Sequence, residues 1–164
     1  MLELTLIRHA KSSWDEAGLS DFDRPLNDRG RRDAPRMGRR LKELGVHFDL
    51  MLSSPAQRAI ETARLIAAEL HYPDYRIRTL ESLYNADADT LLEEIQRIES
   101  GVRHAALVAH NPGISRLYHL LTGESVDMPT CTAATIRFDV DDWQGVHMDL
   151  GWPKHYEYPK KLKD

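Results

Sequence analysis

Short apolar segments alternate with amphipathic segments along most of this chain, and no other feature restricts its fold as strongly. Strands are expected at 2–7, from 46 or 48 to 52, at 76–80 and at 105–108. Helices are expected at about 28–44, from Ser54 to Pro73, at about 88–98 and from Pro112 to Gly123. This order predicts an α/β fold, a three-layer sandwich in which a mostly parallel open sheet carries helices on both faces.

A few residues predict where these helices begin and end. Asn27 is expected to cap the first helix and Gly45 to end it, although Pro35 removes one backbone N–H inside it. Ser54 is expected to cap the second helix, with Pro55 at its first position, where the missing N–H costs nothing.

The last part of the chain predicts two more strands. Apolar and polar residues alternate over 134–140, which indicates a half-buried strand at or near an edge, and a final strand is expected at 146–150. The stretch 152–164 contains four lysines and two tyrosines. It is expected to be a packed or frayed tail, with a basic docking element for an acidic partner as the alternative.

Composition excludes several classes of protein. The 164 residues fit a single domain, 1–164, and 41% apolar with 29% charged residues is typical of a globular chain. A net charge of −4 provides no basic field for nucleic acid, and no apolar run reaches the ~18 residues that span a bilayer. We expect no signal peptide, because no basic region or small-residue cleavage site is visible after Met1, and Cys131, the single cysteine, cannot form an internal disulfide. We therefore expect a cytoplasmic protein that binds neither nucleic acid nor membrane.

Polar clusters follow three of the expected strands. Arg8 and His9 come directly after the first strand, and residues 53–58, which include Arg58, follow the second strand and open a helix. His110 follows the strand at 105–108, where Pro112 opens another helix. Because ligands of such sheets lie beyond the carboxyl ends of parallel strands, the two arginines, two histidines and two helix N-termini are expected to meet there.

This combination of groups suits a phosphate. Helix N-termini offer free N–H groups and a partial positive charge, and arginine binds phosphate oxygens with two parallel hydrogen bonds. One histidine can be a nucleophile while the other stabilises charge, and nearby cations are expected to lower the histidine pKa values and keep a nucleophile neutral. Phosphoryl transfer needs mainly this positioning and charge neutralisation.

The stretches "LTLIRHAKS", "LSSPAQRAIETA" and "LVAHNPG" resemble the histidine phosphatase superfamily, whose fold is phosphoglycerate mutase-like. More narrowly, the chain resembles the SixA-type phosphohistidine phosphatases, where Arg-His-Ala-Lys-Ser stands in place of the commoner Arg-His-Gly. The stretch "LYNADADTLLEEI" also resembles this branch, so the resemblance covers most of the chain. Ala10 in place of glycine means that the backbone after the nucleophile must tolerate a Cβ atom.

The resemblance implies a role for each matching residue. His9 would be the nucleophile that becomes phosphohistidine, and Arg8, Arg58 and His110 would complete the phosphate pocket, with His110 donating to a phosphoryl oxygen. Glu81 lies in the region where many members place the acid that protonates the leaving group. The alternative for Glu81 is a solvated carboxylate at a strand end.

The sequence allows two interpretations of Lys11 and Ser12, which follow the expected nucleophile closely. Lys11 and Ser12 either bind the substrate phosphate or belong to a solvated loop. The remaining histidines show no metal-ligand spacing, and no P-loop or dinucleotide fingerprint is present. We therefore expect no metal and no cofactor.

The spacing of the clusters bears on the substrate. Only 28 residues separate Glu81 from His110, which leaves no room for a large cap, so the loop 13–27, with Trp14, Phe22 and four acids, is the candidate lid. An open site suits a phosphorylated protein better than a small caged metabolite. Imidazole, with a pKa of about 6.5, also leaves easily. We expect a phosphatase that acts on phosphohistidine in proteins or on another phosphoramidate.

Other functions stay open from the sequence. The first alternative is a broad-specificity phosphomonoesterase that takes small phosphorylated substrates. The second is a non-catalytic phosphoprotein-binding module, although such a module does not need an unblocked nucleophile. A phosphomutase would need a longer insertion to retain its intermediate.

Overall fold

The computed structural model describes residues 1–15 and 17–162 of the chain, so Glu16 of the candidate lid and Lys163 of the tail lie outside it. The strands in this part are β1 (Leu2–Arg8), β2 (Leu50–Ser53), β3 (Arg78–Thr79), β4 (His104–Ala109), β5 (Ala133–Phe138) and β6 (Gly151–Glu157). The α-helices are α1 (Asp28–Glu43), α2 (Gln57–Glu69), α3 (Ala88–Gln96) and α4 (Gly113–Thr122). Short 3₁₀ turns connect them, among them η1 (Asp21–Asp23), η3 (Glu81–Leu83) and η5 (Pro159–Lys161).

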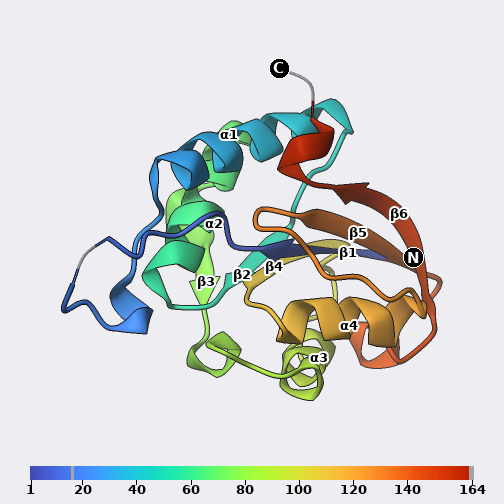
Figure 1. Ribbon diagram of the computed structural model, residues 1–164. Helices are drawn as coiled ribbons and strands as arrows, with labels where there is room; N and C mark the ends of the chain where they lie inside the picture. Colours follow the sequence, from blue (N-terminus) through green and yellow to red (C-terminus); the bar gives the residue numbers. More distant parts are fainter. Residues whose placement is uncertain (16, 163–164) are drawn as a thin grey trace.

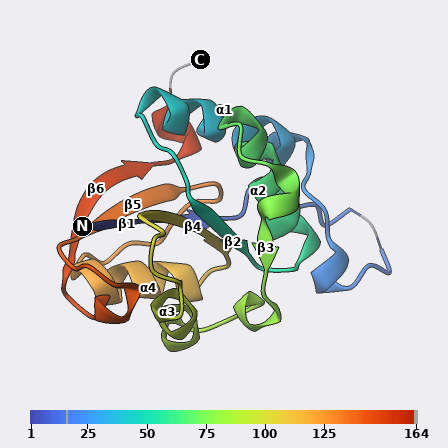
Figure 2. The same cartoon turned by 180° about the vertical axis from the view of Figure 1, so that it is seen from behind.

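The described strands form one sheet in the order β3-β2-β4-β1-β5-β6. The first four positions of that order are parallel, and β5 is antiparallel to both β1 and β6. Helices α1 and α2 cover one face while α3 and α4 cover the other (Figures 1 and 2). The predicted three-layer α/β sandwich with a mostly parallel sheet is therefore confirmed.

Burial on both faces explains the continuous apolar runs of the central strands. Alternate side chains of β4 point to opposite faces: Leu107 lies in the core beneath α3 and α4, and Val108 in the core beneath α1 and α2. In β1, Leu6 and Ile7 divide in the same way. This two-sided covering is typical of parallel strands, and it fixes where each strand ends relative to its neighbours.

The last two strands agree with the prediction only in part. β5 lies next to the edge strand β6, as predicted, but it is buried over most of its length, where a half-buried strand was expected. Residues 146–150 form no strand, and β6 begins at Gly151 instead. The sequence of β6 does not look like a strand, because Trp152 and Lys154 are exposed and Pro153 has no backbone N–H. A sheet tolerates such a proline in an edge strand.

The predicted helix ends are confirmed in part. Asn27 caps α1, because its side chain accepts a hydrogen bond from the Gly30 N–H, and α1 continues through Pro35. Ser54 is not the cap of α2, which begins at Gln57. The Ser54 hydroxyl instead accepts from the Ala56 N–H, so the polar turn after β2 is longer than predicted.

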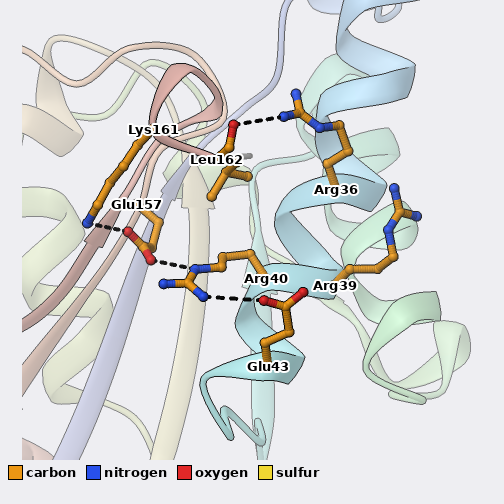
Figure 3. A pocket seen from close by; sticks show the side chains of 7 residues that line it. All are labelled: Arg36, Arg39, Arg40, Glu43, Glu157, Lys161 and Leu162. Carbon is orange, nitrogen blue, oxygen red and sulfur yellow. Dashed lines mark hydrogen bonds and ion pairs between the residues drawn. The ribbon is translucent and has the colours of Figure 1, made fainter. Parts of the chain in front are cut away.

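The C-terminal segment packs against α1 (Figure 3). Arg40 on α1 donates from Nε to the buried Glu157 carboxylate at 2.7 Å, and Lys161 of η5 forms an ion pair with the same carboxylate. Arg36 donates to the Leu162 carbonyl. The described part of the tail is therefore packed, as expected. No helix in the described residues is long and apolar enough to cross a membrane.

Candidate active site

The carboxyl ends of the parallel strands bring the three polar clusters together. The register pairs Arg8 at the end of β1 with Ala109 at the end of β4, and Ser53 of β2 with Val108. His9 and His110 therefore leave the sheet side by side, with their ring centroids 5.2 Å apart. Arg58, in the first turn of α2, donates from Nε to His9 Nε2 at 3.4 Å, and its Nη2 lies 3.4 Å from His110 Nδ1.

These side chains line one cavity of about 370 Å³, whose walls are mostly polar. The predicted residues on its wall are Arg8, His9, Lys11, Ser12, Arg58 and His110. The structure thus brings together every predicted site residue except Glu81. Among the described residues, no three His, Cys, Asp or Glu side chains gather as a metal site would require.

Local contacts fix the orientation of the His9 ring. Nδ1 lies 2.8 Å from the carbonyl oxygen of Ala10, and because a carbonyl only accepts, Nδ1 carries the proton. The lone pair is then on Nε2, which faces Arg58. The Ala10 N–H donates to the Thr62 hydroxyl, and the Ala10 methyl group is buried in the core under α1 and α2, so this position accommodates a Cβ atom.

Both histidines are neutral at neutral pH. Burial, with a further contribution from Arg58 and Arg8, lowers the pKa of His9 to about 4. Burial, together with His9 and Arg58, lowers the pKa of His110 to about 3. The sequence predicted this direction but attributed it to nearby positive charge, whereas desolvation is the larger cause.

A hydroxyl group holds the far side of His110. The Ser54 Oγ lies 2.7 Å from His110 Nε2, and the Tyr84 ring packs edge-on against the imidazole at 5.6 Å. Since a hydroxyl both donates and accepts, Ser54 is compatible with either neutral tautomer of His110. One of these tautomers places a proton on Nδ1, the nitrogen that faces Arg58.

Arg8 is anchored at one end only. Its Nη1 donates to the Met128 carbonyl at 2.6 Å, while its buried Nε has no hydrogen-bond partner within the described part of the chain. Burial lowers the pKa of Arg8, partly offset by Asp127. Because Arg8 lines the cavity, its guanidinium has hydrogen-bonding capacity left for a bound anion.

The sequence did not identify Asp21, Arg24 and Tyr84 as site residues. The Asp21 carboxylate accepts from Arg58 at 3.1 Å, from Arg24 at 3.1 Å and from the Tyr84 hydroxyl at 2.6 Å. The hydrogen bond from Tyr84, with the charges and hydrogen bonds of Arg58 and Arg24, lowers the pKa of Asp21 to about 2. Asp21 and Arg24 lie in a long loop without periodicity, so no spacing in the sequence pointed to them.

Glu81, Lys11 and Ser12 occupy different kinds of position. Glu81 begins η3, is exposed, and is not among the residues that line the cavity. Lys11 is exposed on the cavity wall, and Ser12 is buried there, with its hydroxyl accepting from Arg24 at 2.7 Å. Trp14 at the rim is 74% exposed and lies under the Arg24 guanidinium.

Comparisons with known proteins show the family of the chain. The family model of the histidine phosphatase superfamily (branch 1) matches residues 4–91. An uncharacterized chloroplastic protein of Arabidopsis thaliana is 32% identical over 86% of this chain and 68% of its own length.

Solved structures match nearly the whole chain. The protein histidine phosphatase SixA complexed with tungstate has a TM-score of 0.85 and 25% identity, covering 99% of this chain and all of that one. A protein of Agrobacterium tumefaciens assigned as a phosphohistidine phosphatase SixA has a TM-score of 0.83 and 26% identity, covering 96% of this chain and 98% of that one.

Proposed function

The chain belongs to the histidine phosphatase superfamily, branch 1, and we propose that it hydrolyses phosphohistidine in proteins, or another phosphoramidate, through a phosphohistidine intermediate on His9. The family implies a phosphorylated substrate. The observation that carries the proposal is the environment of His9, whose Nδ1 is tied to the Ala10 carbonyl while Nε2 keeps its lone pair toward Arg58 and His110.

Substrate binding follows from the contacts among the residues that line the cavity. The 3.4 Å contacts from Arg58 to the two histidines are long, so phosphoryl oxygens replace them at little cost. The Arg8 guanidinium, which also lines the cavity, offers a further donor. With Ser54 donating to His110 Nε2, the proton on Nδ1 points to a phosphoryl oxygen, which gives His110 its role as charge-stabilising donor.

The reaction then has two displacement steps. In the first, His9 Nε2 attacks phosphorus, the N–P bond to His9 forms, and the bond from phosphorus to the leaving nitrogen breaks as the leaving group takes a proton from solvent. In the second, a water oxygen attacks phosphorus and gives up a proton to solvent, the bond to Nε2 breaks with its electron pair returning to His9, and inorganic phosphate leaves. A neutral His9, with its pKa lowered to about 4, is ready for the first attack across the physiological range.

The surroundings of the cavity support a protein-borne substrate. Between Glu81 and His110 the chain forms only η3, α3 and β4 with their connections, so no inserted domain covers the site. Trp14 and Lys11 at the rim are exposed, which leaves room for an approaching protein surface. The similarity to a protein histidine phosphatase that binds tungstate, an oxyanion, supports the same assignment.

Leaving-group chemistry also favours a phosphoramidate. The acid expected from the sequence, Glu81, does not line the cavity, and Asp21, which does, is ionised because its pKa is about 2. Imidazole, with a pKa of about 6.5, needs little help to depart protonated, whereas an alkoxide needs an acid. A site without an obvious proton donor is therefore better matched to phosphohistidine than to a sugar phosphate.

A substrate panel tests the proposal. We expect higher kcat/KM for a phosphohistidine peptide and for phosphoramidate-phosphorylated protein than for phosphoserine peptides or sugar phosphates. Equal or higher turnover of sugar phosphates, with no activity on phosphohistidine, would instead identify a small-molecule phosphomonoesterase. Binding of the phosphopeptides without any turnover would identify a non-catalytic binding module.

A further inference from the structure

The Arg58 guanidinium is held along one edge and free for a ligand along another. Its Nη1 donates to the Asp21 carbonyl oxygen at 2.6 Å, and its Nη2 donates to the Asp21 carboxylate at 3.1 Å. Asp21 thus accepts hydrogen bonds from both terminal nitrogens of Arg58, one with its backbone carbonyl and one with its side chain. Because a guanidinium is planar and rigid, fixing this edge fixes the direction of the remaining donors.

The other edge of Arg58 faces the reacting atoms. Nε points to His9 Nε2 and the second Nη2 hydrogen points toward His110 Nδ1, both at 3.4 Å. These are the two weak contacts that a phosphoryl group replaces. The short contacts to Asp21 involve the opposite edge, so a phosphate can bind to Arg58 without displacing Asp21.

Asp21 is itself anchored from two other parts of the chain. The Tyr84 hydroxyl, which follows η3, donates to Oδ2 at 2.6 Å, and Arg24 donates to Oδ1 from Nε and Nη2. Phe22 packs edge-on against the Tyr84 ring at 5.1 Å. η1 is thereby joined to Tyr84, in the segment after β3, beside Arg58.

We propose that Asp21 is the positioning residue of this site: it holds the terminal edge of Arg58 so that Nε and Nη2 are directed at the phosphoryl group on His9. This inference rests on the proposed function for the identity of the bound group. It makes Asp21, in the loop that the sequence suggested as a lid, a working part of the phosphate pocket. Tyr84 acts through Asp21 by holding its carboxylate.

A carboxylate beside an anion site also has an unfavourable effect, and the two effects have opposite signs. The negative charge of Asp21 repels a bound dianion, so Asp21→Asn tightens oxyanion binding through charge alone. Loss of orientation at Arg58 weakens binding. A single substitution measures the sum of the two, and a double-mutant cycle is needed to separate them.

Tungstate affinity, measured calorimetrically, provides the cycle. Asp21→Asn is introduced into the wild type and into Arg58→Lys, which keeps the positive charge but has no planar fork to orient. We expect Asp21→Asn to tighten tungstate binding in Arg58→Lys. In the wild type, the effect of Asp21→Asn on tungstate affinity should be about tenfold less favourable than in Arg58→Lys. A factor of this size corresponds to the loss of one charge-assisted hydrogen bond. The same fold-change in both backgrounds would overturn the proposal, because Asp21 would then act through charge or competition only.

Two controls complete this experiment. Asp23→Asn changes the neighbouring carboxylate in η1, whose side chain accepts from Ser20, and is expected to leave tungstate affinity and turnover unchanged. Tyr84→Phe removes one donor to Asp21 without changing charge, and is expected to weaken tungstate binding in the wild type but not in Arg58→Lys. Weakening in both backgrounds would show that Tyr84 acts independently of Arg58 and would contradict the arrangement proposed here.

A leaving-group series separates positioning from proton donation. For aryl phosphates of increasing leaving-group pKa, we expect Asp21→Asn to lower kcat by the same factor throughout. A loss that grows with leaving-group pKa would make Asp21 the proton donor and overturn the assignment. Tungstate binding does not depend on turnover, so failure of the proposed phosphatase activity is distinguishable from failure of this inference.

Discussion

His9 presents its two ring nitrogens to different environments, and this difference defines its chemistry. Nδ1 is committed to the Ala10 carbonyl, and Nε2 faces the guanidinium of Arg58. Burial is the main reason that the pKa of His9 falls to about 4. At this pKa the ring is neutral without help from a carboxylate partner, so it is a nucleophile that needs no general base.

A histidine NMR titration tests the protonation state of the site. We expect the His9 and His110 rings to remain neutral between about pH 8 and pH 5, and kcat/KM to be lost through His9 only as the pH falls through about 4. Activity is lost at low pH and not at high pH, because protonation occupies the lone pair of the attacking Nε2. A His9 midpoint near the ordinary value of about 6.5 would contradict the burial argument.

Glu81→Gln is the corresponding test of the acid expected from the sequence. Glu81 is exposed and does not line the cavity, so we expect kcat and KM for a phosphohistidine peptide to stay within about twofold of the wild type. Steady-state kinetics on matched preparations measures this. A large loss of kcat would mean that the segment after β3 brings Glu81 to the substrate.

At the scale of elements, the start of α1 supports the turn that carries the nucleophile. The Lys11 carbonyl accepts from the Asn27 N–H, and a Cβ on Gly30 would lie 2.2 Å from that same oxygen. The close approach of α1 to the residues after His9 therefore depends on glycine at this position.

Gly30→Ala is expected to displace residues 10–12 because the Lys11 carbonyl is backbone and cannot move alone. We predict a loss of about 1–3 kcal/mol of stability by chemical denaturation, together with weaker tungstate binding. Arg32→Ala, two residues further along and exposed, is the matched control. A variant as stable and as tight-binding as the wild type would show that this approach is not needed.

The central strands that the sequence predicts correctly are buried on both faces, whereas the strand that it does not predict lies at the exposed edge of the sheet. Leu6 and Leu107 belong to strands buried on both faces, which produce continuous apolar runs that are readily detected. β6 is an exposed edge with Pro153 inside, so its sequence resembles a tail. The alternating pattern placed Thr135 on the exposed face of its strand. It is buried instead, and its hydroxyl group forms a hydrogen bond with the hydroxyl of Thr5 on the adjacent strand.

The residues of the candidate site also fall into two groups, those at the ends of regular elements and one in a loop. Arg8, His9, Arg58 and His110 are placed by strand ends and a helix start, and these follow from the pattern of apolar residues. Asp21 reaches Arg58 from a loop, 37 residues away in sequence. Only the folded arrangement of η1, α2 and the segment after β3 brings it there, which no local pattern encodes.

At the scale of the whole molecule, buried neutral histidines couple folding to pH. Burial lowers the pKa of His9 and His104 to about 4 and that of His110 to about 3. In the unfolded chain each titrates near 6.5. Between these values the unfolded state binds more protons than the folded state, so acidification favours unfolding.

We therefore predict that stability is full above about pH 7 and falls as the pH drops from about 6.5 toward 4, by about 1 kcal/mol per pH unit for each histidine. Urea unfolding at a series of pH values measures the slope. His104→Gln, which changes the histidine that contacts Thr5 outside the active site, should reduce it. Stability that is flat from neutral to acid pH, or a slope unchanged in His104→Gln, would contradict this assignment.

The reaction proposed for this site depends on one covalent bond between His9 and the substrate phosphorus. The protein is incubated briefly with a radiolabelled phosphoramidate, quenched in alkali, which preserves phosphohistidine, and digested for peptide mapping. We predict an acid-labile, base-stable phosphoryl group on His9, with label and turnover both lost in His9→Ala. Absence of label in the wild type together with undiminished turnover in His9→Ala would rule out a phosphohistidine intermediate on His9.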